Sequence, residues 1–534
     1  MKMKFKKNVF KTIEEMVVSN TGMTLEELLN DSDREPYIKD LDRAVELTRS
    51  YMEAHPEKPI YIIGDYDCDG ITSSSIMYWT FAKLRRNPIV RIPLRFTEGY
   101  GLSEKIIAEI PEESFVITVD NGIAAIRPIQ LAKDKGMTVV VTDHHLPVME
   151  DGKIVLPPAD VVVDPHLGGS EFEDYCGAGI AYRFALAITG SKCVPALLAL
   201  AGVGTVADVM PLVGANRTLV KKTLRVLNSH SNVPGMNALL GELEIERINE
   251  TGIGFHIAPV INASGRLNDD GAMDAFRLFT ETENTREAAR ELILLNSSRK
   301  KLTREALDLV KDTLDGQKPI VVYDEKIGEG IIGLVSGKLS EKYRCPVITF
   351  TKIKNGEGEE ILKGSGRSVP GINLKEALDR ISDLILGYGG HAGAAGLSIR
   401  KENLDAFRKA FREACGEMPE NVDEIIYDFD IPARAIPKFV EKQQKFAPYG
   451  EGNPRPIVHL VHNAVGDWKR IGDGSHFMLR DPRITFMGFG LADEYEAMGA
   501  PRHLDVVGYV SQDWYKGKPS YKFEIISFRK EEEG

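Results

Sequence analysis

The most unusual chemical feature of this sequence is a group of three acidic residues that follows an apolar run. The stretch GDYDCDG places Asp65, Asp67 and Asp69 within five residues, directly after PIYII, which has the pattern of a buried strand. Asp is disfavoured in strands, and neighbouring carboxylates repel one another when nothing neutralises them. We therefore expect a positive charge to lie beside these residues.

Acidic residues and histidines also follow two later strand-like runs. Asp120 ends VITVD, and Asp143 ends VVVTD, where His144 and His145 come next. The carboxyl ends of parallel strands share one edge of an α/β sheet, and ligands bind at that edge. Asp208, in GTVADVMPL, lies in a helical region that could pack across it. Each Asp alone is better explained as a helix N-cap, and the histidine pair as a surface or core feature, but the whole set is hard to explain in this way.

The combined donor set indicates a class of metal ion. Carboxylate oxygens with one imidazole suit Mn²⁺ or Mg²⁺ better than a metal that prefers thiolates. Five such side chains exceed what one octahedral ion usually takes from a protein, which favours a bridged pair of ions about 4 Å apart. Such a pair activates water and holds the attacking and leaving oxygens of a phosphoryl transfer. The residues alone therefore favour metal-dependent phosphoryl chemistry.

The first part of the chain alternates strand-like and helix-like segments. Continuous apolar runs separated by amphipathic segments predict a parallel sheet covered by helices on both faces. Residues 176–275 have a mainly helical pattern with many small residues. The expected strands are 61–64, 89–94, 114–119, 137–142 and 159–164.

Three further segments complete the expected organisation. A long helical pattern over 283–314 suits a helix that joins two domains, and an ordinary packed helix is almost as good an interpretation. A second α/β unit begins at KPIVVYDE and ends near Cys415. The C-terminal remainder has short alternating strands, typical of a small β-barrel or sandwich.

Composition limits the class of protein. The chain has 534 residues, 43% hydrophobic and 27% charged, which predicts about three domains of a soluble protein. Its five cysteines are scattered and form no CxxC pair, so neither a disulfide framework nor a cysteine zinc site is expected. No signal peptide or membrane span is apparent, which predicts a cytoplasmic protein without membrane contact. A net charge of −12 argues against coating nucleic acid through bulk charge but leaves a local basic groove open.

Four motifs make a family recognisable. DYDCDG, VDNG, TDHH and VADVM, in this order, resemble the motifs of the DHH phosphoesterase superfamily. Longer segments such as RIPLRFTEGYGLSE, GSGRSVPGINL, GYGGHAGAAGLSI and APYGEGNPRPI resemble the RecJ family of bacterial single-strand-specific 5′→3′ DNA exonucleases. The resemblance implies an α/β protein with four parts. These are a parallel-sheet DHH domain (1–278), a connecting helix (279–315), a DHH-associated α/β domain (316–416) and an OB-like β-barrel (417–534).

The resemblance also implies roles for individual acids and histidines. Asp120 would bridge two ions, while Asp65 and His145 would support the ligands or face the substrate. Relatives with two full sites often carry a His four residues before the position of Asp67, where this chain has Ile63. One or two ions of Mn²⁺ or Mg²⁺ are therefore expected. The implied metal ligands are Asp67, Asp69, Asp120, His144 and Asp208.

Other matched residues imply phosphate recognition. Arg95, Ser365 and Arg367 correspond to residues that hold the 5′-terminal phosphate, and an Arg fork with a hydroxyl suits a phosphate dianion. Arg266 and His391 correspond to residues near the scissile phosphate. Taken singly, the arginines are better explained as surface ion-pair partners, and the glycines around His391 as a tight turn into a strand.

The function that the resemblance implies is hydrolysis of single-stranded DNA from its 5′ end to 5′-mononucleotides, in repair or recombination. We expect a monomer that binds a 5′-ended single strand, with contacts to a single-strand-binding protein or a helicase left open. The alternatives are a DHH phosphodiesterase acting on short oligonucleotides or cyclic dinucleotides, and a non-catalytic replication scaffold. Aromatic residues of the C-terminal part are candidates for base stacking, although core packing is the better interpretation for most of them. They are Trp468, Phe477, Trp514 and Tyr515.

Overall fold

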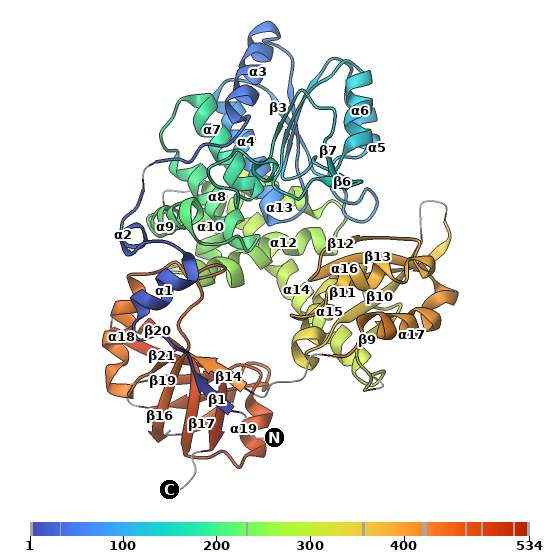
Figure 1. Ribbon diagram of the computed structural model, residues 1–534. Helices are drawn as coiled ribbons and strands as arrows, with labels where there is room; N and C mark the ends of the chain where they lie inside the picture. The colour runs from blue at the N-terminus through green and yellow to red at the C-terminus, as the bar shows by residue number, and fades with distance from the viewer. Residues whose placement is uncertain are drawn as a thin grey trace.

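Three sheet-containing bodies and a helical region make up the protein (Figure 1). The computed structural model describes residues 4–530, apart from 33, 231–232, 315, 355–357, 419–423, 465–466, 482–483 and 516–517. None of the helices within these described ranges is long and apolar enough to cross a membrane.

The first sheet confirms the parallel α/β pattern expected from the sequence. Its five parallel strands lie in the order β3-β2-β4-β5-β8. The bounds are β2 (Ile60–Ile63), β3 (Pro88–Arg91), β4 (Phe115–Val119), β5 (Thr138–Thr142) and β8 (Val161–Val163). One face packs on α3 (Leu41–Ala54), α4 (Cys68–Lys83) and α7 (Gly177–Thr189), and the other on α5 (Glu104–Glu109) and α6 (Ile126–Asp134). Apolar residues on both faces of each strand explain the near-continuous hydrophobic runs.

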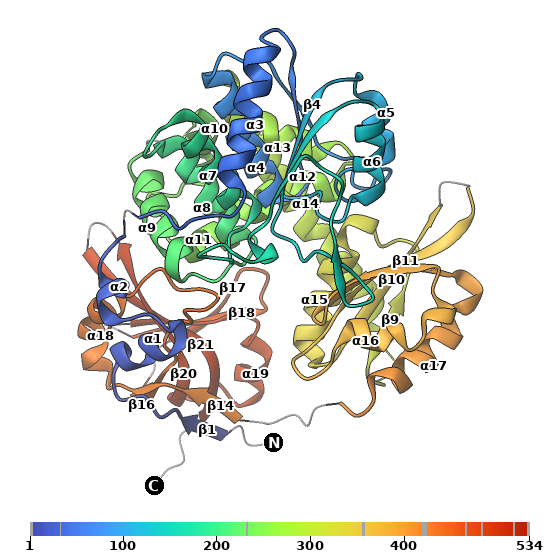
Figure 2. The same ribbon diagram turned by 45° about the horizontal axis from the view of Figure 1, so that its top comes forward.

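A helical region follows the sheet and leads to the second α/β domain (Figure 2). Helix α8 packs on α4, α7 and α9, and α12 packs on α14, so the region is continuous with the first sheet. The long helix expected to connect the domains is α14 (Thr285–Lys311). The other helices are α8 (Pro195–Ala207), α9 (Gly214–Asn228), α10 (Pro234–Glu242), α11 (Glu250–Gly252), the π-helix η2 (Ile253–Ile257), α12 (Ala258–Leu267) and α13 (Gly271–Thr280).

The second α/β domain contains a mixed sheet in the order β12-β13-β11-β10-β9. Strands β9 and β10 are parallel, whereas the other neighbours are antiparallel. The bounds are β9 (Ile320–Tyr323), β10 (Val347–Lys354), β11 (Glu360–Arg367), β12 (Gly387–Gly390) and β13 (Ala394–Arg400), with helices α15 (Ile332–Tyr343), α16 (Leu374–Asp379) and α17 (Leu404–Cys415).

The C-terminal domain is a seven-stranded sheet in the order β15-β16-β20-β21-β19-β18-β17, with helices α18 (Ile436–Gln444) and α19 (Ala492–Ala497). Phe477 is fully buried and stacks on Tyr495 with ring centroids 4.5 Å apart, and Trp468 packs edge-on against the same ring. Phe477 and Trp468 therefore pack in the core of the domain. Core packing, rather than base stacking, is the interpretation that the sequence favours for them. The side chains of Trp514 and Tyr515 lie outside the described residues. The strand bounds are β15 (Phe429–Asp430), β16 (Val458–Ala464), β17 (Trp468–Ile471), β18 (His476–Arg480), β19 (Ile484–Gly488), β20 (His503–Tyr515) and β21 (Lys518–Lys530).

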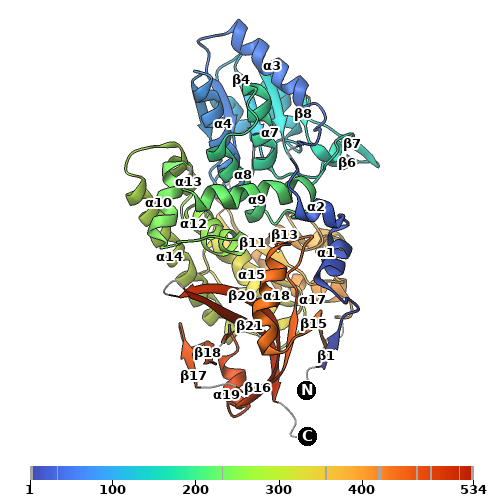
Figure 3. The ribbon, with the colours of Figure 1, turned by 90° about the vertical axis from the view of Figure 1, so that its left-hand side faces the viewer.

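The N-terminal segment departs from the expected first domain of 1–278. Strand β1 (Lys4–Lys7) pairs in parallel with β14 (Glu424–Tyr427), just ahead of the C-terminal sheet (Figure 1). Figure 3 shows β1 and α1 on the side of the C-terminal domain. Helices α1 (Ile13–Thr21) and α2 (Leu25–Leu29) bury their apolar faces in the C-terminal core. The segment therefore packs with the end of the chain, because its apolar side chains find their partners there. The buried residues that it contributes are Ile13, Met16, Val17 and Leu28.

A buried arginine joins the helical region to the C-terminal domain. Arg217 on α9 is 1% exposed, and its guanidinium donates to the carbonyl oxygens of Ala447 (3.0 Å), Pro448 (3.2 Å) and Leu28 (3.2 Å). These carbonyls belong to the loop between α18 and β16 and to the end of α2. One side chain thus ties three segments together.

We expect Arg217→Ala to lower the free energy of unfolding by about 3 kcal/mol, because three carbonyl groups lose their donor. Urea denaturation measures the change. Arg225→Ala on the same helix is the control, since its side chain is 65% exposed and forms a surface ion pair with Asp31. This change should lower the free energy of unfolding by less than about 1 kcal/mol. If both variants lowered the free energy of unfolding equally, Arg217 would not have the proposed role of joining the three segments.

Candidate active site

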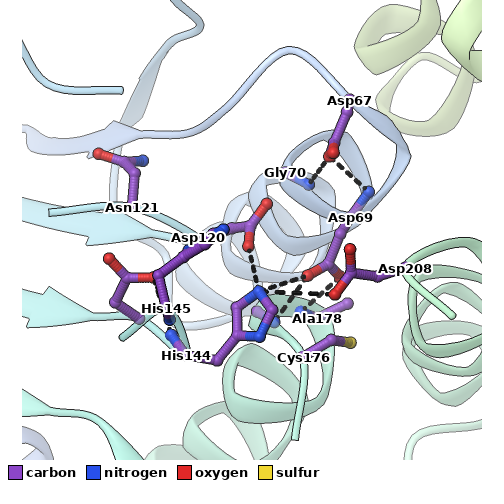
Figure 4. Close-up of polar contacts among 12 residues, drawn as sticks. Asp67, Asp69, Gly70, Asp120, Asn121, His144, His145, Cys176, Ala178 and Asp208 are labelled. Carbon is purple, nitrogen blue, oxygen red and sulfur yellow. Dashed lines mark hydrogen bonds and ion pairs between the residues drawn. The ribbon is translucent and has the colours of Figure 1, made fainter. Parts of the chain in front are cut away.

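The acids singled out by the sequence converge at the carboxyl edge of the first sheet (Figure 4). Asp67 follows β2, Asp120 follows β4, and the Asp143–His145 segment follows β5. Asp208 ends α8 and reaches the same space from the helical region, as its ion-pair distance to His144 shows. The expected convergence is therefore observed.

Asp67 and Asp69 each accept hydrogen bonds at a helix N-terminus. Asp67 Oδ1 accepts from the backbone N–H groups of Asp69 (3.0 Å) and Gly70 (3.1 Å), so Asp67 is also the N-cap of α4. The two oxygens of Asp69 accept from Gly177 (2.7 Å) and Ala178 (2.9 Å) at the start of α7. Asp67 is therefore an N-cap, as expected for a single Asp after a strand, and it is also a member of the acidic cluster. These bonds fix both carboxylates.

Asp120 lies at the centre of the cluster in a left-handed backbone conformation, with φ +62°. The start of α7 approaches it so closely that a Cβ added to Gly177 would lie 2.5 Å from the Cβ of Asp120. Only glycine therefore fits at position 177. Asp120 Oδ1 is buried and accepts no hydrogen bond from the described residues.

Asp143 positions the histidine pair. Its Oδ1 accepts from the backbone N–H of His144 (2.7 Å) and from the ring Nδ1 of His145 (2.7 Å), and its Oδ2 accepts from the N–H of Ile123 (2.8 Å). Burial works against the charged ring, but the hydrogen bond and the charge of Asp143 raise the pKa of His145 to about 9. Tyr100 also places its hydroxyl 3.1 Å from His145 Nδ1. His145 is therefore protonated at neutral pH.

His144 is the point where the carboxylates meet. Its Nε2 lies 3.0 Å from Asp120 Oδ1 and 3.7 Å from both Asp69 Oδ2 and Asp208 Oδ2. Burial lowers the pKa of His144, which leaves a neutral imidazole able to bind a metal. Three groups place their ligand atoms within 4.8 Å of one another. They are Asp69–His144–Asp208, Asp65–Asp67–Asp120 and Asp120–His144–His145.

Asp65 lies closer to the cluster than the supporting role expected for it. It is 2% exposed and groups with Asp67 and Asp120, and its Oδ1 has no hydrogen-bond donor within the described chain. Ile63, by contrast, is fully buried against the helices on the other face of the sheet. The carboxylate of Asp65 thus stands where it can contribute an oxygen to a second ion.

Electrostatics show that this cluster fits divalent cations. Burial, with repulsion from neighbouring carboxylates, holds the pKa of Asp65 and Asp120 well above the ordinary value. The same two causes raise the pKa of Asp67 and bring that of Asp208 to about 8. Carboxylate oxygens without donors beside a neutral imidazole are the donor set that Mn²⁺ or Mg²⁺ prefers. Those residues therefore fit a bound pair of such ions.

Arginines from three parts of the chain lie beside the acids. Burial, with the positive charges of Arg95 and Arg299, lowers the pKa of Arg266 to about 10, and Arg367 adds to the effect. Arg95 stacks its guanidinium 4.4 Å from the ring centroid of Tyr66, between Asp65 and Asp67. Like charges held this close form a site for an anion such as phosphate.

Ser365 and Arg367 come from the second α/β domain and lie together. Arg367 Nη1 donates to Ser365 Oγ (3.4 Å), and both side chains approach Gly333 in the first turn of α15. The two domains meet where a Cβ on Gly330 would lie 1.8 Å from the carbonyl oxygen of Arg266, so this contact requires glycine. This contact between the domains brings Arg367 close to Arg266.

His391 lies apart from the acidic cluster. It is exposed at the turn between β12 and β13, and its hydrogen bonds within the described chain stay inside that hairpin. Because Arg367 pairs with Ala394 across the sheet, His391 lies at the same sheet end as Arg367.

Comparisons with known proteins match all three domains. Family models match as DHH family, N-terminal domain (59–205), DHHA1 domain (316–417) and RecJ OB domain (427–527). The single-stranded-DNA-specific exonuclease RecJ of Haemophilus influenzae is 32% identical over 95% of this chain and 90% of its own length. This chain belongs to the RecJ family. The RecJ of Bacillus subtilis is 33% identical over 86% of this chain, which spans 60% of that relative.

Solved RecJ structures share the fold. RecJ from Thermus thermophilus in complex with Mn²⁺ gives a TM-score of 0.81 at 28% identity, covering 97% of this chain and 76% of that one. A structure of exonuclease RecJ bound to manganese gives 0.63 at 31% identity, covering 73% of this chain and 97% of that one. The expected architecture of DHH sheet, connecting helix, DHH-associated domain and OB domain is thereby confirmed.

Sequence reasoning gave no role to two residues of the site in this RecJ-family chain. In the sequence Asp143 is simply an acid at a strand end, yet in the structure it accepts hydrogen bonds from both histidines. Arg299 lies in the middle of α14, anchored by two hydrogen bonds to Asn296 Oδ1 (2.8 and 3.1 Å), and no local pattern marks it. The signal for Asp143 was its position directly before the histidine pair.

The metal-free protein should lose stability as pH rises. Because burial and neighbouring carboxylates raise the folded-state pKa of Asp120 and Asp208, the stability they contribute is fully present below the unfolded value of 3.8. It is lost as pH rises through the raised pKa values, that of Asp208 being about 8. In EDTA at pH 8, Asp120→Asn should therefore unfold at a higher temperature than the unaltered protein. Excess Mn²⁺ should stabilise the unaltered protein by about 2.7 kcal/mol at 100 times Kd, and the variant by less.

Thermal unfolding with and without Mn²⁺ measures both effects. Asp134 is an exposed acid on α6, and Asp134→Asn is the control. This variant should change neither the unfolding temperature in EDTA nor the stabilisation by Mn²⁺. A Mn²⁺ response of Asp120→Asn equal to that of the unaltered protein would contradict the proposed metal centre.

Proposed function

We propose that this chain hydrolyses single-stranded DNA from its 5′ end, one nucleotide at a time, with divalent cations held by the acidic cluster. The observation that carries the proposal is the pairing of a buried carboxylate cluster with a group of arginines contributed by both α/β domains. The relatives named above are single-stranded-DNA-specific exonucleases, which supports the substrate. A DNA substrate also agrees with the cytoplasmic location expected from the sequence.

The proposed ligands are Asp67, Asp69, Asp120, His144 and Asp208, with Asp65 contributing to a second ion. When bound, Mn²⁺ or Mg²⁺ would neutralise the phosphoryl oxygens and lower the pKa of water. The hydrogen bond and charge of Asp143 favour the protonated form of His145, which would offset negative charge that develops on the substrate. The guanidinium of Arg266 would have the same effect.

Arg95, Ser365 and Arg367 are proposed to hold the 5′-terminal phosphate, and His391 to approach the scissile phosphate from the second α/β domain. Hydrolysis breaks the bond between phosphorus and the 3′ oxygen of the first nucleotide. The phosphate then remains on the shortened strand, so each product has the 5′ phosphate that the arginines bind. This regeneration favours removal of successive 5′-mononucleotides, a chemistry suited to repair or recombination.

A polarity assay tests the proposed function. Single strands labelled at the 5′ or the 3′ end are incubated with Mn²⁺, and the 5′-labelled strand should release labelled mononucleotide from the first turnover. The 3′-labelled strand should shorten gradually, and a blunt duplex should resist. Asp120→Ala should abolish hydrolysis without loss of helical signal, since it removes the central carboxylate. Release of mononucleotide first from the 3′ end would contradict the proposal.

Arg367→Ala should reduce the preference for a 5′ phosphate. The ratio of kcat/KM for 5′-phosphorylated and 5′-hydroxyl strands should fall roughly tenfold or more, because a charged hydrogen bond to the phosphate is lost. Arg408→Ala, which removes a surface partner of Asp405 in the same domain, should leave the ratio unchanged. An equal fall on both strands would assign Arg367 to the chemical step instead.

A further inference from the structure

One aromatic side chain that contacts the acidic cluster stays exposed. The hydroxyl of Tyr100 donates to the carbonyl oxygen of Asp120 (3.0 Å) and lies 3.1 Å from His145 Nδ1. Tyr100 is nevertheless 50% exposed. Its hydroxyl is thus bound at the cluster while the residue remains open to solvent.

The loop that carries Tyr100 is fixed to the end of β4. Gly99 (φ +82°) and Gly101 (φ +66°) flank the tyrosine in left-handed conformations, which glycine adopts freely. The N–H of Leu102 donates to Asn121 Oδ1 (3.2 Å), and Asn121 Nδ2 donates to carbonyl oxygens at the ends of β4 (2.9 Å) and β2 (3.1 Å). These bonds hold the tyrosine at the carboxyl edge of the first sheet, where the acids converge.

Tyr100 belongs to a row of side chains that begins at an arginine of the proposed 5′-phosphate site. The guanidinium of Arg95 lies 4.4 Å from the ring centroid of Tyr66. The Tyr66 ring meets that of Tyr100 edge-on, with centroids 6.4 Å apart. Tyr100 in turn meets His145 edge-on at 5.6 Å. Arg95 and the acidic cluster therefore lie at the two ends of the row, with the two tyrosines between them.

The proposed function places one phosphate at each end of this row. The 5′-terminal phosphate is held at Arg95 and the first phosphodiester at the acids, and a single nucleoside joins these two phosphates. That nucleoside therefore lies beside the tyrosine rings. Tyr66 is half-buried and covered by Arg95, whereas Tyr100 is open to contact.

We propose that the ring of Tyr100 stacks on the base of the 5′-terminal nucleotide and so positions the first phosphodiester at the acids. This inference deepens the proposed function and rests on it. Every base has a face that an aromatic ring can stack on, so the contact tolerates any sequence. An enzyme that removes successive nucleotides needs such tolerance, because each new terminal base takes the same place.

Equilibrium binding tests the stacking contact independently of hydrolysis. Fluorescence anisotropy with a 5′-phosphorylated 12-nucleotide single strand, in Ca²⁺ instead of Mn²⁺, gives Kd. Tyr100→Leu should raise Kd roughly 5-fold to 100-fold, the loss of one stacked base. Tyr100→Phe keeps the ring and should stay within about 2-fold of the unaltered protein. Tyr37→Leu, which removes another exposed tyrosine (48%), is the matched control and should leave Kd unchanged.

A strand that lacks only its 5′-terminal base locates the contact. The unaltered protein should bind this abasic strand roughly 5-fold to 100-fold more weakly than the intact strand, and Tyr100→Leu should bind both strands alike. Equal Kd values for the unaltered protein on the two strands would overturn the inference, as would an equal loss for Tyr100→Leu on both.

Hydrolysis by the unaltered protein in Mn²⁺ separates this inference from the proposed function. Release of 5′-mononucleotides together with equal Kd values for the intact and the abasic strand would contradict the inference alone. No release of 5′-mononucleotides from a strand that the protein binds would contradict the proposed function and, with it, the place of the terminal base.

Discussion

Repulsion between buried carboxylates is the constraint on which the rest of this structure depends. Asp65, Asp69 and Asp120 are each 2% exposed, and Asp65 and Asp120 each have an oxygen with no donor among the described residues. Such charges are costly unless a cation joins them. The fold nevertheless fixes them firmly, with Asp69 bound to the start of α7 and Asp120 packed on Gly177. These contacts position the carboxylates through the protein itself, which is the arrangement that a preorganised metal centre needs.

The opposite charge is supplied by a second cluster that exists only when two domains meet. Arg95 and Arg266 come from the first part of the chain, Arg299 from the connecting helix and Arg367 from the second α/β domain. Burial, with the positive charges of Arg95, Arg299 and Arg367, lowers the pKa of Arg266, as burial and the neighbouring carboxylates raise that of Asp120. A phosphate group placed between the two clusters, with cations on the acids, relieves both kinds of repulsion. Substrate and cations are thus the missing counter-charges of the fold.

Most of the site's placement could be predicted from sequence because it follows from local rules. Strands that are apolar on both faces form a parallel sheet, and residues after such strands meet at one edge, which brought Asp67, Asp120 and His144 together. The Asp65 carboxylate lies deeper in the cluster than its supporting role implied, since side-chain direction at a strand end depends on the turn that follows.

Features that depend on long-range packing were not predictable. The N-terminal helices pack in the C-terminal core although their sequence carries only an amphipathic pattern, which does not name a partner. Arg217 is buried and Arg299 is half-buried, and the periodicity of their helices gives no reason to expect either guanidinium there. Phe477 resembled a stacking residue as well as a core residue, and only its packing on Tyr495 decides for the core.

The central claim is that the acidic cluster is built to hold divalent cations. Crystals grown with Mn²⁺ and measured at the manganese absorption edge locate such ions directly by their anomalous scattering. The structure predicts two anomalous peaks that share Asp120, one about 2–2.5 Å from oxygens of Asp69 and Asp208 and the other at a similar distance from oxygens of Asp65 and Asp67. A single peak would contradict the proposed contribution of Asp65 to a second ion. No peak within the cluster at saturating Mn²⁺ would contradict the whole account.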